Sequence, residues 1–169
     1  MARVNPIPPG RHTLTPNLVL RDCARAIEFY KRAFGAVEVT RMPAPDGKSV
    51  WHAELRIGDS VFFLNDEMPG MSREAPNAAH PSPMTLWLSV EDCDAAHKRA
   101  LGAGATSTMP PTDMFWGDRC GSVADPFGYL WAFTTHQKDM TDAEMRRAGE
   151  EFARSMAQRQ GMGQPSQHA

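Results

Sequence analysis

Along the chain, short runs in which apolar and polar residues alternate are separated by turn-forming glycine, proline and aspartate residues. Alternation with a period of two is typical of strands with one buried face. It predicts four strands in each half of the chain, with a proline-rich linker at 66–84 between the halves. The predicted strands are 13–20, 37–42, 50–57 and 60–65, followed by 85–90, 105–109, 120–124 and 129–134.

One helix is predicted in each half, directly after the first strand of that half. In the first half, Tyr30 and Phe34 lie at helical spacing with small apolar residues beside them, so one face of the helix is apolar. Asp22 is placed to cap the N-terminus with its carboxylate, because that group accepts from free backbone N–H groups. Gly35 is placed to end the helix in the left-handed conformation.

Both halves therefore have the order β-α-β-β-β, and residues repeat along with the elements. The segment 30–36 (YKRAFGA) aligns with 97–103 (HKRALGA) at an offset of 67, whereas the caps Asp22 and Asp92 differ by 70. The difference of three predicts that the second helix, ending at Gly102, is shorter by about one turn. A period of this length indicates a duplicated module rather than a solenoid repeat.

The ends of the chain have different patterns. The segment 1–12 is rich in proline and is expected to be an extended arm. Thr141 and Glu144 form a capping box, and apolar residues then recur three or four positions apart, which predicts an amphipathic helix over 141–160. Its apolar stripe must pack on its own domain or on a partner chain. We expect 161–169 to be disordered.

Composition excludes several classes of protein. The 169 residues are 41% hydrophobic with a formal net charge of -2, and no basic cluster indicates nucleic-acid binding. No apolar run approaches the roughly 18 residues that span a bilayer. The N-terminus lacks the apolar region of a secretory signal. Cys23, Cys93 and Cys120 form no CxxC pair, so we expect free thiols and a cytoplasmic location.

Two motifs carry a family resemblance. The segment 25–36 (RAIEFYKRAFGA) resembles the first-helix signature of the PhnB-like branch of the vicinal-oxygen-chelate superfamily, which holds glyoxalase I, bleomycin-resistance proteins and extradiol dioxygenases. The segment 115–119 (FWGDR), followed by 125–128 (DPFG), resembles the second signature of that branch. Residues 135–145 resemble its usual C-terminal extension. The resemblance extends over 13–145, most of the chain.

The resemblance implies an α+β fold. Two tandem βαβββ modules, at 13–65 and 85–136, would form a single domain with a cup-shaped mixed sheet, with a C-terminal helix added. The family also implies a homodimer and a site inside the cup. Because one fold supports many chemistries, the function has to be argued from the site itself.

Metal-using members of the family place four side chains, usually His, Glu or Gln, on the first and last strands of the modules. The matching positions are Thr15, Phe63, Thr85 and Ala132, or, after a two-residue shift that keeps the face, Asn17, Asn65, Trp87 and Thr134. Neither set contains a histidine or carboxylate, so we expect no metal and no other cofactor. His52 and Glu54, which share one face of a predicted strand, could supply two ligands elsewhere or make ordinary polar contacts.

Large aromatic side chains occur on or beside most of the predicted strands, where each lines either the core or a ligand cavity. Arg119 could hold an anion against neighbouring aromatic rings, or pair internally with Asp118 or Asp125. The predicted ligand-binding residues are Trp51, His52, Phe63, Trp87, Phe115, Trp116, Arg119 and Trp131.

These observations favour a metal-free protein that binds and sequesters a small hydrophobic or aromatic molecule. The alternative is a metal-dependent lyase, isomerase or dioxygenase of the same superfamily, in which a divalent ion polarises substrate oxygens. Metal-free catalysis with Glu54 or His52 as base, and an assembly role for the C-terminal helix, also stay open. The sequence does not decide whether any reaction is catalysed.

Overall fold

The structure is a computed structural model that describes residues 5–8, 10–77 and 79–161. Part of the predicted arm (1–4 and 9) and most of the predicted tail (162–169) lie outside the described residues. The elements in chain order are β1 (Asn17–Leu20), α1 (Cys23–Phe34), β2 (Val37–Pro43), β3 (Val50–Ile57), β4 (Ser60–Asp66), β5 (Thr85–Ser89), α2 (Cys93–Ala103), β6 (Thr106–Asp113), β7 (Asp118–Ala124), β8 (Leu130–His136) and α3 (Asp142–Gly161).

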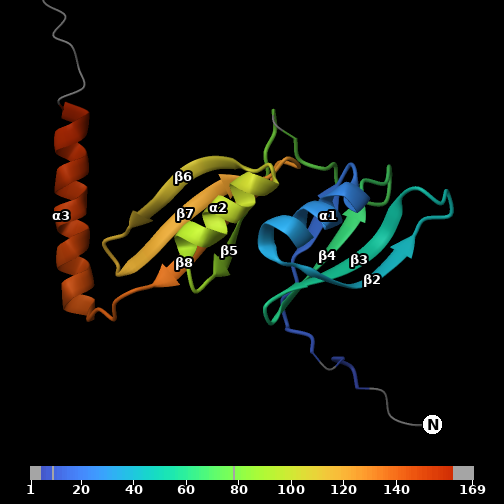
Figure 1. Cartoon of the computed structure of the whole chain (residues 1–169), viewed down its shortest axis with the longest axis horizontal. Helices are drawn as coiled ribbons and strands as arrows, with labels where there is room; N and C mark the ends of the chain where they lie inside the picture. The colour runs from blue at the N-terminus through green and yellow to red at the C-terminus, as the bar shows by residue number, and fades with distance from the viewer. Residues whose placement is uncertain (1–4, 9, 78, 162–169) are drawn as a thin grey trace, which may run out of the picture.

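Two βαβββ modules and a separate C-terminal helix make up the molecule (Figure 1). Sheet A has the strand order β1-β4-β3-β2, and sheet B has the corresponding order β5-β8-β7-β6. In each sheet the first and last strands of the module run parallel, and the other pairs are antiparallel. The predicted duplication is therefore present in the topology. Among the described helices, none combines the length and apolar character needed to cross a bilayer.

The caps predicted for α1 are confirmed. The Asp22 carboxylate accepts a hydrogen bond from the backbone N–H of Arg25 at 3.0 Å, and Gly35 has a φ of 69°. The shortening predicted for α2 is wrong, because α2 has 11 residues against 12 in α1. The helix continues through Gly102 and ends at Gly104, whose φ of 110° satisfies the left-handed cap. The two modules thus match at a nearly constant offset.

Helices α1 and α2 each cover one face of their own sheet and lie next to each other in the middle of the molecule (Figure 1). Buried side chains from both modules form one core beneath them. The Phe34 and Trp131 rings lie 4.4 Å apart, and the Tyr30 and Trp131 rings 5.3 Å apart, centroid to centroid. Since each sheet packs one face into this shared core, its other face points away from the core.

A buried carboxylate joins the modules within this core. Asp125 is 6% exposed and accepts hydrogen bonds from the Tyr30 hydroxyl and the Trp131 indole N–H, both at 2.9 Å. It also accepts from the backbone N–H groups of Phe127 and Tyr129, at 2.8 and 2.9 Å. Burial raises the pKa of Asp125, and these four hydrogen bonds oppose the rise. The segment 125–128 is therefore a structural junction between α1 and sheet B.

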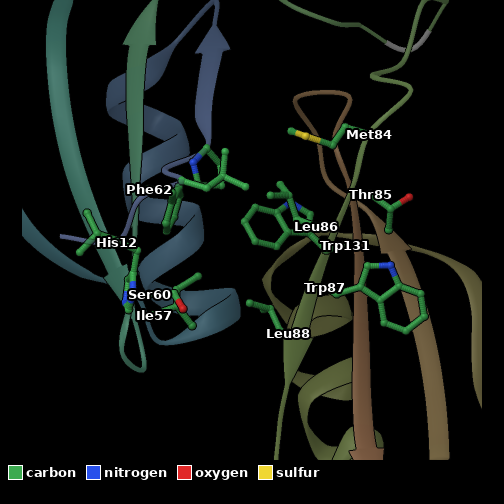
Figure 2. Close-up of a pocket in the computed structure, with 13 residues that line it drawn as sticks. His12, Ile57, Ser60, Phe62, Met84, Thr85, Leu86, Trp87, Leu88 and Trp131 are labelled. Carbon is green, nitrogen blue, oxygen red and sulfur yellow. The ribbon is translucent and has the colours of Figure 1, made fainter. Parts of the chain in front are cut away.

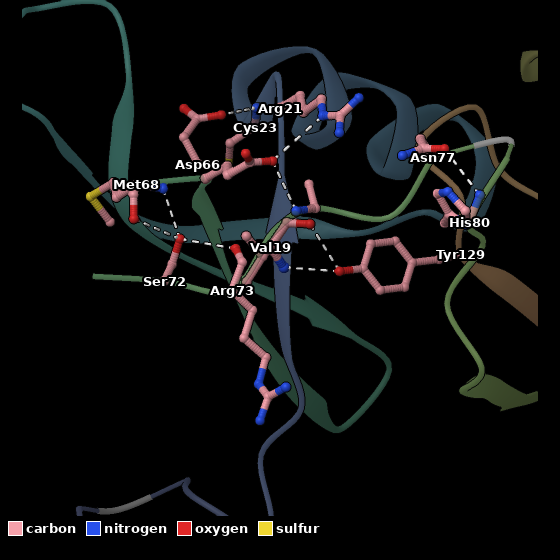
Figure 3. Close-up of polar contacts among 12 residues, drawn as sticks. Val19, Arg21, Cys23, Asp66, Met68, Ser72, Arg73, Asn77, His80 and Tyr129 are labelled. Atoms are coloured by element: carbon pink, nitrogen blue, oxygen red, sulfur yellow. Dashed lines mark hydrogen bonds and ion pairs between the residues drawn. The ribbon is translucent and has the colours of Figure 1, made fainter. Parts of the chain in front are cut away.

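The long linker is ordered where the structure describes it, and it packs beside the free edge of β1 (Figure 3). The Tyr129 hydroxyl accepts from the N–H of Val19 and donates to its carbonyl, both at 2.9 Å. In the linker, Asn77 and His80 exchange two backbone hydrogen bonds in a tight turn, and the backbone N–H of Ser82 donates to the Gly128 carbonyl at 2.9 Å. A side chain of the second module thus occupies backbone groups of the first.

We predict that Tyr129→Phe lowers the free energy of unfolding by about 1–3 kcal/mol, because both Val19 backbone groups lose their partner. Urea unfolding monitored by circular dichroism measures the change. Ser60→Ala is the matched control, since it removes a hydroxyl that bonds only to its exposed neighbour Asp59, and should change stability by less than about 0.5 kcal/mol. Equal effects of the two substitutions would contradict a junction at Tyr129.

Candidate functional site

Each sheet has an open face, opposite its helix, on which candidate site residues collect. In sheet A, Glu54 pairs with Phe63 across β3 and β4, and Phe63 pairs with Asn17 across β4 and β1. His52 lies two residues before Glu54 on the same face. The open face of sheet A thus carries one row of side chains across three neighbouring strands. The sequence predicted that His52 and Glu54 share a face, but it did not predict that Phe63 lies beside them.

Arg11, from the segment before β1, completes a polar cluster on this face. Its guanidinium makes an ion pair with Glu54 and lies 4.9 Å from the centroid of the Phe63 ring. The His52 Nε2 atom lies 3.3 Å from the Glu54 Oε1 atom, and the His52 and Phe63 rings meet edge to face at 4.9 Å. Burial of Glu54 would raise its pKa, but hydrogen bonds from Arg11 and His52 outweigh burial and hold that pKa below the ordinary value.

One atom of this cluster has no partner. Among the described residues, the Nη1 atom of Arg11 is the buried side-chain nitrogen or oxygen that makes no hydrogen bond. Leaving a buried donor unpaired costs about 1–3 kcal/mol, more for a charged group. Nearby, the Asn17 side-chain amide donates to Asn65 Oδ1 at 3.0 Å, and the Asn65 amide donates to the Asp66 carbonyl at 2.8 Å. Among the described residues, the buried side-chain donor without a partner is therefore the Arg11 guanidinium.

The open face of sheet B is less charged. Trp87 on β5 is 57% exposed and pairs with Ala132 on β8, which in turn pairs with Ser122 on β7. The Ser122 hydroxyl hydrogen-bonds to Thr108 at 2.7 Å. A large exposed indole beside small and hydroxyl side chains forms an apolar wall with little electrostatic character.

Carboxylate and imidazole groups gather at one end of this face. Asp118 accepts from the Trp116 indole at 3.1 Å and from the Thr134 hydroxyl at 3.3 Å, and it lies 2.8 Å from His136 Nδ1. The other nitrogen of His136 lies 3.0 Å from Asp139. Hydrogen bonds to Asp118 and then Asp139 raise the pKa of His136 above its ordinary value. A hollow of about 640 Å³ adjoins this group.

A third feature is a mostly apolar cleft of about 520 Å³ between the two modules (Figure 2). Phe62 and Ile57 point into it from sheet A, and Leu86 and Leu88 point into it from sheet B. Its size is within the range of small-molecule pockets. His12, from the segment before β1, borders the same cleft and lies within hydrogen-bonding distance of the Asp59 carbonyl, at 3.3 Å.

The predicted binding residues fall into separate groups. His52 and Phe63 meet on sheet A, and Trp51, the residue before His52, is 43% exposed. Trp87 lies on the open face of sheet B. Phe115 and Trp116 pack edge to face at 4.9 Å in the turn before β7, where Phe115 also contacts Phe152 of α3 at 5.2 Å. Within one chain, the sheet A and sheet B groups do not form one site among the described residues.

Two predicted residues have other roles. Trp131 is 2% exposed, forms part of the core and also lines the cleft between the modules. Arg119 points toward α2 and pairs with Asp94 at 2.9 Å and Asp113 at 2.8 Å. Internal pairing of Arg119 was one of the two alternatives from sequence, but both partners proposed there were wrong. Asp118 is excluded because it lies on the opposite face of β7 from Arg119, and Asp125 because it is buried in the core and bonded to Tyr30 and Trp131.

Sequence reasoning missed Arg11 and the link between Asp118 and His136. Arg11 lies 43 residues from Glu54 in sequence, so no local spacing indicates the pair. His136 is the last residue of β8 rather than a residue beyond it, and period-two alternation from Ala132 through Thr134 could have placed it on the open face.

The family's metal position does not suit this chain. The first and last strands bring together Asn17 and Phe63 in sheet A, and Trp87 and Ala132 in sheet B. Indole, phenyl and methyl groups offer no lone pair for a divalent ion, and an amide is a weak ligand. Within the part of the chain that the structure describes, no three His, Cys, Asp or Glu side chains are grouped to hold a metal ion. We therefore derive no step through a metal.

The fold and these open sheet faces correspond to a known class of proteins. A family model described as the Glyoxalase/Bleomycin resistance protein/Dioxygenase superfamily matches residues 11–133. The match covers most of the 169 residues, so the chain belongs to this superfamily. The fold of two βαβββ modules that the sequence resemblance implied is confirmed.

Particular relatives are similar over most of the chain. The uncharacterized protein Rv0887c of Mycobacterium tuberculosis is 44% identical over 138 residues, covering 80% of this chain and 81% of that protein. The uncharacterized protein At5g48480 of Arabidopsis thaliana is 32% identical over 126 residues, covering 69% and 74%. The crystal structure of TioX from Micromonospora sp. ML1 has a TM-score of 0.61 at 28% identity, covering 75% of this chain and 99% of that one. None of these names specifies a ligand.

We predict that the pKa of His136, measured by NMR titration of its ring, lies above 6.5, and that Asp118→Asn lowers it. A raised folded-state pKa means that protonated His136 stabilises the fold below pH 6.5 and that this stabilisation disappears as pH rises through the raised value. Asp59→Asn, a carboxylate bonded only to its neighbour Ser60, is the control and should leave the titration unchanged. A wild-type value at or below 6.5 would contradict the geometry.

Proposed function

We propose that this protein binds a small hydrophobic or aromatic molecule without using a metal. The observation that carries the proposal is an exposed Trp87 and a half-buried Phe63 on the sheet faces where metal-using relatives place ligands. A large aromatic side chain such as that of Trp87 is costly to expose, and an apolar surface bordered by polar residues is typical of binding sites. The apolar cleft between the modules adds a second surface of the same character.

We also assign the chain to the PhnB-like branch of the superfamily. The support is the pair of signature segments, 25–36 and 115–128. Tyr30 of the first segment and Asp125 of the second are hydrogen-bonded to each other in the core. The signatures therefore correspond to the contact that joins the modules, which explains why they would occur together in one branch.

Two copies are proposed to complete the site. Sheet A offers charged and amide groups, sheet B offers an apolar wall, and one chain keeps the two open faces apart. A homodimer that sets sheet A of one copy against sheet B of the other would enclose a cavity between them and cover Trp87. Isologous association of this kind uses the same pair of surfaces twice.

We predict that the purified protein binds the uncharged dye Nile red, with enhanced dye fluorescence, and that Trp87→Ala weakens binding by about tenfold, or about 1.4 kcal/mol. Leu101→Ala is the matched control, because Leu101 is a 39% exposed apolar side chain on α2, away from both open faces. Dialysis against a chelator should leave dye binding unchanged, with substoichiometric transition metal in elemental analysis.

The metal-dependent alternative gives a different result. A full equivalent of tightly held Ni²⁺, Zn²⁺, Mn²⁺ or Fe²⁺, whose removal abolishes binding, would overturn the metal-free proposal. His52 and Glu54 would then be the first residues to substitute, since they form the adjacent histidine–carboxylate pair on the open face of sheet A.

Sedimentation velocity tests the dimer. We expect a dimer for the wild type, and Trp87→Glu should shift the equilibrium toward monomer by about tenfold or more, because a charge would be buried in the apolar wall. Leu101→Glu places the same charge on α2 and should leave the dimer intact. A wild-type monomer across the accessible concentration range would remove the two-copy site.

A further inference from the structure

Arg11 stands apart from the other charged residues of the chain. It belongs to the segment before β1, outside both sheets, and lies across Phe63 with its Nη2 atom on Glu54. A guanidinium presents N–H donors in a planar fork, so pairing one side leaves the other available. The unpaired side is the Nη1 atom, which is buried beneath the surface and has no acceptor among the described residues.

The Glu54 carboxylate beside Arg11 accepts hydrogen bonds from described residues through only one of its two oxygens. Both hydrogen bonds to Glu54, from Arg11 and His52, involve the Oε1 atom, and no described residue bonds to Oε2. The Arg11 and Glu54 side chains are 25% and 14% exposed, so the pair lies at the border of the open face. The face therefore offers one unpaired donor and one unpaired acceptor beside an aromatic ring.

The charges of Arg11 and Glu54 determine which class of ligand fits this face. Arg11 and Glu54 cancel each other, so an organic anion would approach a carboxylate without a net positive charge to compensate. An organic cation would approach the guanidinium with the same disadvantage. An uncharged oxygen, such as a carbonyl, accepts from Nη1 without adding charge, and a planar ring packs on Phe63 and the His52 edge.

From these observations we propose that Arg11 determines specificity, by donating from Nη1 to a carbonyl-type oxygen of an uncharged aromatic ligand that lies against Phe63. The inference rests on the proposed binding function and names the class of ligand for it. Arg11 is carried by an irregular segment rather than by a strand, so a small shift of that segment can bring Nη1 to the ligand oxygen.

Equilibrium dialysis with three probes of similar shape tests this. The probes are 2-acetonaphthone, which has a carbonyl, 2-ethylnaphthalene, which has none, and 2-naphthoate, which is an anion at neutral pH. In the wild type, 2-naphthoate should bind more weakly than 2-acetonaphthone. The preference for 2-acetonaphthone over 2-ethylnaphthalene should fall by about tenfold in Arg11→Met, a difference of about 1.4 kcal/mol.

The ratio of two ligands within one variant cancels any loss of folded protein. Arg11→Lys should also lose most of the preference, because an ammonium does not reproduce the fork that holds Glu54 and the ligand together. Arg25→Met is the matched control, since the Arg25 guanidinium lies 5.7 Å from the Phe127 ring, away from this face, and its ratio should equal that of the wild type.

The outcomes separate the two proposals. If both uncharged naphthalenes bind but their ratio is unchanged in Arg11→Met, the role of Arg11 is overturned while the binding function stands. If 2-naphthoate binds most tightly, the charge argument is overturned. If neither uncharged naphthalene binds up to its solubility limit, the binding function itself fails, and the role of Arg11 fails with it.

Discussion

The buried carboxylate of Asp125 is the constraint on which the arrangement of the molecule depends. A carboxylate removed from water must be satisfied by hydrogen bonds, and Asp125 takes them from Tyr30 of α1, from Trp131 of β8 and from its own turn. These partners can meet only if α1 packs against β8 in a core that both modules share. Both sheets then turn their other faces outward. The buried contact of Asp125 therefore decides which sheet faces are open to a ligand, although Asp125 itself lies in the core.

The two outward faces differ although their modules are duplicates. Sheet A holds Arg11, Glu54 and His52 beside Phe63, whereas sheet B offers Trp87 with small side chains around it. In the proposed binding function, the polar groups on sheet A would orient the ligand and sheet B would bury its apolar area. The proposed ligand chemistry and the proposed pairing of two copies both follow from this difference.

Local signals in the sequence were sufficient for much of the fold. Asp22 and Gly35 bounded α1 correctly, and alternation gave β3 at Val50–Ile57, because capping and strand periodicity depend on near neighbours. The end of α2 was misplaced because either Gly102 or Gly104 could cap it, and only packing selects between them. The partners of Arg11 and Arg119 lie far away in sequence, at Glu54 and Asp94, so they depend on tertiary structure that local patterns do not encode.

The Tyr129 hydroxyl, bonded to both backbone groups of Val19, also has a consequence for how the chain associates. A parallel edge strand with free N–H and C=O groups is a template for adding strands from other molecules. An aromatic hydroxyl inserted at the middle of β1 occupies the groups that an incoming strand would need. Edge-to-edge growth at β1, which has no natural end, is thereby blocked, and this agrees with the proposed face-to-face pairing, which would close after two copies.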